Sequence, residues 1–578
     1  MLPPSGTVLT ILHPEASAEP PPYFHQRFSP TGEILNPAWP RLTTDDSVRL
    51  FPPRADGLRV LLINPPIREW SYPNIIPLGQ AYVASVAVMD GHRVSVLDLN
   101  AERRKPVKEP DNVFSAWVEK RVRETLAASK PDVVGIGGII TQYRRIRQIL
   151  RVCKDAYPEI PAVLGGGMAS CLPAFMVERL PIDVAVQEEG EATFSEVLHR
   201  LEERESMEGV RGTAYRTREG EVRNNGLRAS IQAASRGLDS LPWPLRSAWP
   251  VEEVYKRNPV GHLNWQNKWR DGAAADPDQF SVEMIGSRGC PYAVQACDYC
   301  YAAYLGQKYR LRGPKDLVDE MEYLSGRYAA VYIHFLDDLL LTDYKWALSL
   351  FEELRRRGEA TGFHVMWGGT CRTNIVADDV IRARKEGRPH LLEQAHAVGM
   401  RQVGYGIESG SPTILKNIDK SGQTVEKMEI AIAETQRIMG YADCSFMIAS
   451  PGETRETVQE TVDFCRRVGL RPEVLFFTTA YPATSYWKLA LDMGLIRKAV
   501  TGEKGPADDD MIEQYFLKLG EQGEAVRTNF SDLPDEEIID LSWWAINALG
   551  AQNVVRHPHT GEVQVRKPAF RSATQADV

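Results

Sequence analysis

Three cysteines lie close together near the middle of the chain, in the segment RGCPYAVQACDYC at residues 288–300. Six residues separate Cys290 from Cys297, and two residues separate Cys297 from Cys300. Thiolates suit iron–sulfur clusters and zinc alike, but structural zinc normally takes four ligands, and no nearby Cys or His pair completes such a set. Three thiolates on a four-iron cluster leave one iron open to a cosubstrate. The segment therefore predicts a catalytic iron–sulfur cluster, with a zinc knuckle that takes a distant fourth ligand as the alternative.

The bulk composition argues against several classes of protein. The 578 residues carry a formal charge of -9 and contain no basic tract, which argues against nucleic acid as a partner. The apolar runs fall far short of the roughly 18 residues that span a bilayer, and no signal pattern is visible, so we expect a cytoplasmic protein without a membrane partner. The other cysteines stand singly and are expected to be buried thiols rather than disulfides: Cys153, Cys171, Cys371, Cys444 and Cys465.

Two series of short apolar strands alternate with helical segments, and each series predicts a parallel sheet. After an irregular, proline-rich arm at residues 1–55, the first series fills residues 56–205 and predicts a doubly wound, Rossmann-like α/β domain. Residues 206–280 form a connector in which a small hairpin would fit. The second series, at residues 281–490, predicts a partial (β/α)6 barrel. Residues 491–578 are expected to be mostly helical, with a polar tail.

The expected barrel strands place the candidate residues at one edge. The first series has strands at residues 59–64, 93–97, 132–137, 162–166 and 183–187. The second series has strands at residues 282–286, 330–335, 364–367, 402–406, 443–448 and 474–479. Chemistry in such barrels lies at the C-terminal ends of the strands. The three cysteines follow the first barrel strand, and Asp337 and Asp338 follow the second.

With these elements in place, the pattern RGCP…CxYC resembles the cluster-binding loop of radical S-adenosylmethionine (SAM) enzymes, in the branch that carries an N-terminal cobalamin-binding domain. Three residues usually separate the first two cysteines in that family, so we interpret the six residues here as a loop with three extra residues. The resemblance implies that Cys290, Cys297 and Cys300 bind a 4Fe-4S cluster. The aromatic Tyr299 before the last cysteine is retained and is assigned to the same cofactor site.

Two further barrel segments resemble the parts of the family that hold SAM. HFLDDLL offers Asp337 and Asp338 to the methionine amino group, and a carboxylate there can accept its hydrogen bonds. A helix N-cap for residues 344–357 is the alternative for Asp338. GGTCRTN offers Arg372 to the carboxylate of SAM, with a surface salt bridge as the alternative.

Two later barrel segments complete the resemblance. GYGIESGSPTILKNIDK offers Glu408 and Ser409 for ribose or amino contacts. FMIASPGET resembles the segment that lies along the adenine, with Pro451 and with Gly452, where the missing side chain permits close approach of the backbone. Each segment is weak alone, but their order across residues 281–484 supports the family.

The first domain has glycine-rich strand ends, VVGIGGIITQY and VLGGGMAS, which form a crevice at the carboxyl edge of a doubly wound sheet. A generic nucleotide site is the alternative, although no GxGxxG with an acidic ribose ligand follows the first strand. The order of these segments and the EEGE at residues 188–191 resemble the cobalamin-binding domain of the same branch. The resemblance assigns the cobalamin contacts to Gly137, Gly138, Thr141, Gly165, Gly166, Gly167, Ser170 and Glu189.

The sequence lacks the Asp-x-His-x-x-Gly motif that supplies a histidine to cobalt in classical cobalamin modules. The resemblance therefore implies cobalamin without a histidine axial ligand, and His92 is expected in the turn into the second strand. By position, we expect Arg68, Trp70 and Tyr72 against the lower face of the ring.

The resemblance implies a cobalamin-dependent radical SAM methyltransferase. A 5′-deoxyadenosyl radical would abstract hydrogen from the substrate, and methylcobalamin would provide the methyl group. The expected acceptor is an unactivated carbon of a small molecule, with a phosphorus centre as the less favoured target. A reducing partner such as flavodoxin or ferredoxin is implied. A cyclase or ring-rearranging enzyme with the same cofactors is one alternative, and a cobalamin- or metal-binding regulatory protein is the other. The C-terminal aromatics either close over the active site or pack against the barrel: Tyr515, Phe516, Trp543 and Trp544.

Overall fold

The structure is a computed structural model, and it describes most of the chain after the first fifty residues. The described residues are 51–66, 73–102, 111–230, 237–257, 279–293, 296–301, 308–472, 474–519 and 526–550, with the strands at 555–556 and 563–564. All but the last five residues of the predicted N-terminal arm lie outside these ranges. Every helix within them is too short or too polar to cross a bilayer.

The first sheet has seven strands in the order β2-β1-β3-β4-β5-β6-β7. Five are parallel, which confirms the doubly wound α/β fold: β1 (Arg59–Asn64), β2 (Arg93–Asp98), β3 (Val133–Gly137), β4 (Ala162–Gly165) and β5 (Val184–Val186). The antiparallel hairpin β6 (Thr213–Arg216) and β7 (Val222–Asn224) extends the edge beside β5. The connector hairpin therefore belongs to this sheet, because β6 pairs directly with β5.

Helices cover both faces of the first sheet, as continuous apolar strands require. α2 packs on α8, and α4 packs on α5. The helices are α2 (Leu78–Met89), α3 (Leu99–Glu102), α4 (Asp111–Ser129), α5 (Tyr143–Ala156), α6 (Gly167–Cys171), α7 (Pro173–Arg179) and α8 (Gly190–Glu202).

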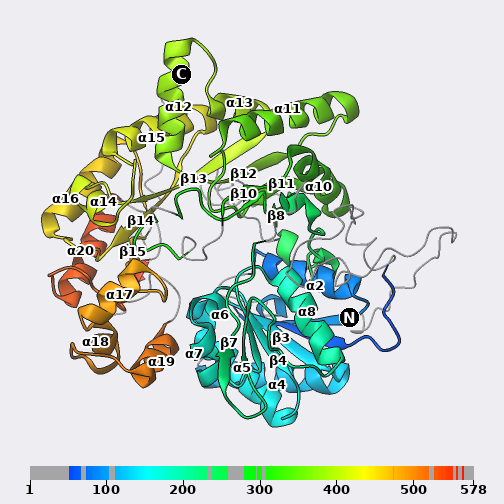
Figure 1. Ribbon diagram of the computed structural model, residues 1–578. Coiled ribbons are helices and arrows are strands. Elements are labelled where there is room, and N and C mark those ends of the chain that lie inside the picture. Colours follow the sequence, from blue (N-terminus) through cyan, green and yellow to red (C-terminus); the bar gives the residue numbers. More distant parts are fainter. Residues whose placement is uncertain are drawn as a thin grey trace.

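The second sheet has six parallel strands in the order β15-β14-β13-β12-β11-β8, which is a half-barrel (Figure 1). The strands are β8 (Phe280–Met284), β11 (Ala330–Phe335), β12 (Met366–Cys371), β13 (Met400–Glu408), β14 (Asp443–Ile448) and β15 (Phe476–Phe477). The predicted end of the third strand at residue 367 was wrong, because the glycines that follow it are part of β12. A Cβ on Gly368 would lie 2.5 Å from the Tyr332 hydroxyl, so glycine permits this close pairing of strands.

Helices connect successive strands of the half-barrel. They are α10 (Pro314–Tyr328), α11 (Tyr344–Thr361), α12 (Thr373–Glu386), α13 (Leu391–Ala397), α14 (Pro412–Asn417), α15 (Val425–Met439) and α16 (Arg455–Arg467). A two-stranded antiparallel ribbon, β9 (Ser287–Arg288) and β10 (Arg310–Leu311), follows β8 and brackets the cysteine segment. The ribbon fixes both ends of that segment beside the half-barrel.

The C-terminal part continues from β15 toward the first sheet (Figure 1). Its helices are α17 (Ser485–Asp492), α18 (Leu495–Thr501), α19 (Asp509–Lys518) and α20 (Asp535–Ala548), and β16 (Val555–Arg556) pairs with β17 (Val563–Gln564). We call the first sheet and the helices that cover it the first unit. α20 packs on α16, whereas α19 packs on α5 of the first unit.

The predicted C-terminal aromatics take the packing alternative in α19. Tyr515 and Phe516 are buried, and the Phe516 ring lies 5.6 Å from the ring of Tyr143. Trp543 and Trp544 are partly buried in α20. Tyr515 and Phe516 therefore help to pack α19 against α5, and Trp543 and Trp544 belong to the helix that packs on α16.

Candidate functional site

The cysteine segment forms a compact loop at the open end of the half-barrel. Gly289 has φ +79°, a left-handed conformation that suits glycine at the sharp turn before Cys290. The Cys300 N–H donates to the Cys297 carbonyl at 2.9 Å. The Asp298 N–H donates to the Ile418 carbonyl, and its own carbonyl accepts from the Tyr486 N–H. The loop is thus fixed to the segment after β13 and to the start of α17.

The donor set of the loop fits an iron–sulfur cluster better than zinc. All three cysteines are half-buried free thiols. Burial raises the pKa of the Cys290 thiol, and the nearby Asp338 and Cys297 raise it further. Among the described residues, the three sulfurs do not all lie within 4.8 Å of one another. Sulfurs around one tetrahedral zinc, at Zn–S distances of about 2.3 Å, would be about 3.8 Å apart.

The six-residue gap between Cys290 and Cys297 contains an anchor to β12. The Tyr292 ring lies under the Arg372 guanidinium, which is 4.0 Å from the ring centre. The Tyr292 hydroxyl accepts a hydrogen bond from the Asn374 side chain at 3.0 Å. The longer loop is therefore tied at Tyr292 to the end of β12 and the start of α12.

Asp337 is a buried carboxylate with one oxygen available. Its Oδ2 accepts from the Gly286 N–H at 2.7 Å, whereas its Oδ1 receives no hydrogen bond of good geometry within the described part of the chain, although Ser287 lies beside it. Burial raises the pKa of Asp337 to about 7. Such an orphaned oxygen suits a donor such as the amino group of SAM.

The alternatives for Asp338 and Arg372 do not hold. The residue that caps α11 is Asp343, which accepts from the Trp346 N–H at 2.9 Å, so the N-cap interpretation of Asp338 was wrong. Arg372 is only 6% exposed and donates to the Ser421 carbonyl at 2.9 Å. A surface salt bridge is therefore excluded for Arg372, and its Nε has no hydrogen-bond partner among the described residues.

Glu408 ends β13 in a left-handed conformation, φ +65°, and is buried. Its carboxylate accepts from the Lys420 ammonium at 2.6 Å and from the Tyr299 hydroxyl at 2.9 Å. The Ser409 hydroxyl lies 3.0 Å from that of Thr461 on α16. Sequence reasoning did not single out Lys420, although it closes the quoted segment GYGIESGSPTILKNIDK.

The segment after β14 makes a tight glycine turn. Gly452 has φ +77°, and a Cβ there would lie 2.5 Å from the Asn417 side chain, which donates to the Pro451 carbonyl. Glu453, which sequence reasoning also missed, is buried beside this turn, and burial raises its pKa to about 7. The signal for Glu453 lay in the quoted segment FMIASPGET.

The carboxyl edge of the first sheet forms a backbone cradle. Gly137 and Gly165 are neighbours in register, and the Gly138 N–H donates to the Gly165 carbonyl at 3.3 Å. A Cβ on Gly165 would meet nothing within 4 Å, whereas one on Gly166, at φ +80°, would lie 2.8 Å from the Gly138 carbonyl oxygen. The open space at Gly165, at the carboxyl edge of a doubly wound sheet, fits a large ligand such as cobalamin.

The cradle continues into α6 and meets the cysteine loop. The Ser170 hydroxyl donates to the Gly166 carbonyl at 3.0 Å and accepts from the Glu188 N–H at 2.8 Å. The Tyr301 hydroxyl, one residue after Cys300, donates to the Gly167 carbonyl. Thr141 is half-buried in a short turn beyond β3. The two candidate cofactor sites are therefore adjacent.

Other predicted cofactor residues lie elsewhere or are not described. Glu189 binds Arg288 and Arg310 of the ribbon. Arg68, Trp70 and Tyr72 lie outside the described residues. His92 is buried before β2, as expected, and its ring Nδ1 accepts from the Leu58 N–H at 3.1 Å. Of the singly placed cysteines, three are buried, and Cys171 and Cys444 are half-buried.

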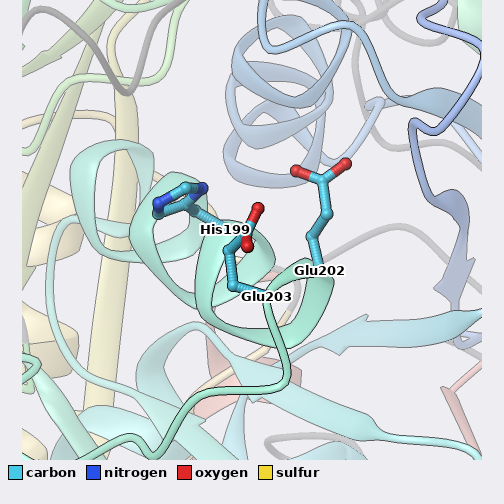
Figure 2. A group of neighbouring side chains, drawn as sticks. All are labelled: His199, Glu202 and Glu203. Atoms are coloured by element: carbon cyan, nitrogen blue, oxygen red, sulfur yellow. The ribbon is translucent and has the colours of Figure 1, made fainter.

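One other group of metal-ligand side chains occurs among the described residues. His199, Glu202 and Glu203 project from the end of α8 (Figure 2). The Glu202 carboxylate already accepts two hydrogen bonds of 2.7 Å from the Arg54 guanidinium. This group is therefore an ordinary helix end with an ion pair.

Comparisons with known proteins divide the chain in the same way. The B12 binding domain model matches residues 70–198, and the Radical SAM superfamily model matches residues 284–465. The uncharacterized methyltransferase PH0819 of Pyrococcus horikoshii is 28% identical over 446 residues, which cover 76% of this chain and 84% of that protein. Cytidylyl-2-hydroxyethylphosphonate methyltransferase of Streptomyces wedmorensis is 24% identical over 76% of this chain and 82% of its own length.

A solved structure shows the same fold. The radical SAM methyltransferase TsrM from Kitasatospora setae, with tryptophan and a SAM analog bound, superposes with a TM-score of 0.59 at 21% sequence identity. The match covers 84% of this chain and 88% of that chain. The fold and site together define an enzyme in which a half-barrel that carries three clustered cysteines adjoins a glycine-lined crevice. The chain belongs to the cobalamin-dependent radical SAM enzyme family, whose cofactors are a 4Fe-4S cluster, SAM and cobalamin.

Proposed function

We propose that this enzyme methylates an unactivated carbon of a small molecule. The observation that carries the proposal is the adjacency of the two cofactor sites, because Tyr301 links the cysteine loop to Gly167 in the crevice. The two relatives named as methyltransferases each match 76% of the chain, which supports methyl transfer. The Streptomyces wedmorensis relative is named for a phosphonate, so a phosphorus-containing substrate belongs among the first to be tested.

Specific side chains in the proposal hold the cofactors. Cys290, Cys297 and Cys300 would hold the cluster, and the glycines at the ends of β3 and β4 would support cobalamin. When bound, the reduced cluster and SAM supply the radical that activates the substrate, and cobalamin supplies the methyl group. Asp337 Oδ1 would accept from the SAM amino group, and Arg372 Nε would donate to its carboxylate.

The Lys420–Glu408–Tyr299 contacts would fix the floor of the SAM site. Lys420 is 7% exposed and donates to the Gly406 carbonyl and to Glu408, both at 2.6 Å. The Tyr299 hydroxyl also donates to Glu408, so the backbone between the second and third cysteines is tied to the end of β13. A preorganised site of this kind orients the cosubstrate without further rearrangement.

The proposal includes an electron donor and a compartment. The cluster must be reduced, and a small carrier such as flavodoxin or ferredoxin would do this in the cytoplasm. All eight cysteines are free thiols in the structure, which suits a reducing compartment.

The proposal is tested with anaerobically reconstituted protein loaded with hydroxocobalamin. We expect iron and sulfide for one four-iron cluster, one cobalamin per chain, and formation of both 5′-deoxyadenosine and S-adenosylhomocysteine with the true substrate. Absence of bound cobalamin, or of both SAM products across a broad substrate panel, would overturn it.

One alternative keeps the same cofactors. The anaerobic magnesium-protoporphyrin IX monomethyl ester cyclase of Rubrivivax gelatinosus is 25% identical over 60% of this chain and 56% of its own length. Formation of 5′-deoxyadenosine without S-adenosylhomocysteine would favour such a ring-closing reaction over methyl transfer.

A further inference from the structure

Two arginines of the β9–β10 ribbon face two glutamates at the start of α8. Arg288 and Arg310 are directly opposite each other in the ribbon. Glu191 binds Arg288 at 2.5 Å, and Glu189 lies 3.1 Å from Arg288 and 2.7 Å from Arg310. Like charges opposite each other on paired strands repel, so the ribbon depends on these carboxylates. We call Glu189, Glu191, Arg288 and Arg310 the ribbon clamp.

The ribbon clamp is buried. Its four side chains are between 4% and 15% exposed, and the Arg288 guanidinium lies 5.0 Å from the centre of the Tyr82 ring on α2. Buried ion pairs contribute little net stability, but loss of one partner leaves an uncompensated charge. Such a network therefore specifies one arrangement of the groups that it joins.

The ribbon clamp joins the two cofactor sites. Arg288 comes two residues before Cys290, and Arg310 follows the loop that carries all three cysteines. Glu189 and Glu191 come from the other unit, directly after Glu188, whose N–H binds Ser170 of the glycine cradle. A shift of either glutamate would move the cluster loop relative to the crevice.

We propose that the ribbon clamp is a set of positioning residues that fixes the separation between the cluster and cobalamin. This inference rests on the proposed function for the identity of the two cofactors. It assigns Glu189 to an ion pair between the units rather than to direct contact with cobalamin. By holding the cysteine loop against the crevice, the ribbon clamp would orient both cofactors toward a shared substrate.

The test compares the double variant Glu189→Gln/Glu191→Gln with the matched control Asp316→Asn. Asp316 binds the buried Arg312 at 2.5 Å, with side chains 4% and 5% exposed, but both residues belong to the barrel side. Each protein is reconstituted, loaded with hydroxocobalamin and reduced, so that cluster and cobalt each carry an unpaired electron. The spin–spin interaction measured by EPR then reports the distribution of distances between them.

We expect wild type and Asp316→Asn to give the same narrow distribution, and the double variant to give a broader or shifted one with unchanged iron and cobalamin content. Methylated product per 5′-deoxyadenosine should fall about tenfold or more in the double variant, because small misplacements of reacting groups are costly. An unchanged distribution in the double variant would overturn the proposal.

The two proposals fail in different ways. If wild type binds both cofactors but methylates nothing, methyl transfer is wrong, and the EPR distances still decide the role of the ribbon clamp. If wild type binds no cobalamin, both proposals are wrong, whereas bound cobalamin with an unchanged distance distribution in the double variant overturns the ribbon clamp alone. If the double variant does not fold, Arg310→Gln replaces it, because this change removes both guanidinium contacts to Glu189 and leaves the Arg288 ion pairs in place.

Discussion

Asp337 combines a buried carboxylate with one oxygen that receives no hydrogen bond of good geometry among the described residues. Burial raises its pKa to about 7, so near neutral pH the carboxyl is divided between its protonated and ionised forms. The ionised form offers two charged acceptor oxygens, whereas protonation turns one of them into an O–H donor and removes the charge. The contribution of Asp337 to SAM binding must therefore be present above pH 7 and lost as the pH falls below it.

This titration predicts a pH-dependent effect of Asp337→Asn on SAM affinity. Above pH 7 the variant should bind SAM about ten- to a hundredfold more weakly, the equivalent of one hydrogen bond to a charged group. Toward pH 6 the ratio of the two affinities should shrink, because wild-type Asp337 becomes protonated. Calorimetric Kd values of both proteins between pH 6 and 8 check this, and a ratio independent of pH would contradict it.

Tyr292 explains how this chain accommodates six residues between its first two cysteines. Its ring lies under Arg372, and its hydroxyl accepts from Asn374, so the extra residues have a fixed contact. We expect Tyr292→Ala to lower the iron content after reconstitution and to broaden the cluster EPR signal. Tyr292→Phe keeps the ring contact and loses one hydrogen bond, about 1 kcal/mol, so its iron content should remain that of wild type. Equal iron content in both variants would show that the anchor is dispensable.

At the scale of elements, the order of strands and helices was predictable from the sequence. Buried runs such as RVLLIN are apolar throughout, and helix ends carry recognisable caps, such as Thr424 before α15 and Gly440 after it. The extent of β12 was not predictable, because glycine usually ends a strand and here permits close contact with Tyr332. The partners of Glu408 and Glu189 were not predictable either, because side-chain pairing follows three-dimensional contacts that local patterns do not record.

The glycine cradle offers a matched pair of substitutions. Gly165→Ala adds a methyl group into open space, so stability should be unchanged while cobalamin affinity falls. Gly166→Ala adds a methyl group at φ +80° and 2.8 Å from the Gly138 carbonyl oxygen, which should cost about 1–3 kcal/mol of stability as well. Urea unfolding and spectrophotometric cobalamin titration measure the two effects. Unchanged cobalamin affinity in Gly165→Ala would place the ligand elsewhere.

At the scale of the whole molecule, two joints between the first unit and the rest of the chain involve residues from distant parts of the sequence. One is the ribbon clamp, and the other is α19, whose Phe516 packs on Tyr143 and Phe175. Glu513 of α19 also accepts from the Tyr143 hydroxyl at 2.9 Å. These joints, together with the Tyr301–Gly167 contact, fix the position of the first unit relative to the rest of the chain.

Removal of the Phe516 ring should weaken the second joint. Truncation of a buried phenylalanine costs about 3–5 kcal/mol, so we expect Phe516→Ala to lower the unfolding free energy and to speed hydrogen exchange in α19 and α5. Val113→Ala on the exposed surface of α4 serves as the control, with a change within about 0.5 kcal/mol. Hydrogen exchange that increases uniformly over the whole chain would contradict a local joint.

The place of α19 in the chain also sets an order of events during synthesis. Residues 509–518 emerge from the ribosome after every strand of both sheets, the last of which ends at Phe477. At about 5–20 residues per second, the nascent chain spends a few seconds with both sheets complete and the second joint still unmade. During this interval the ribbon clamp residues and the glycine cradle have already been synthesised, whereas the α19 contacts to Tyr143 and Phe175 form only afterwards, so the arrangement of the two sheets is completed last.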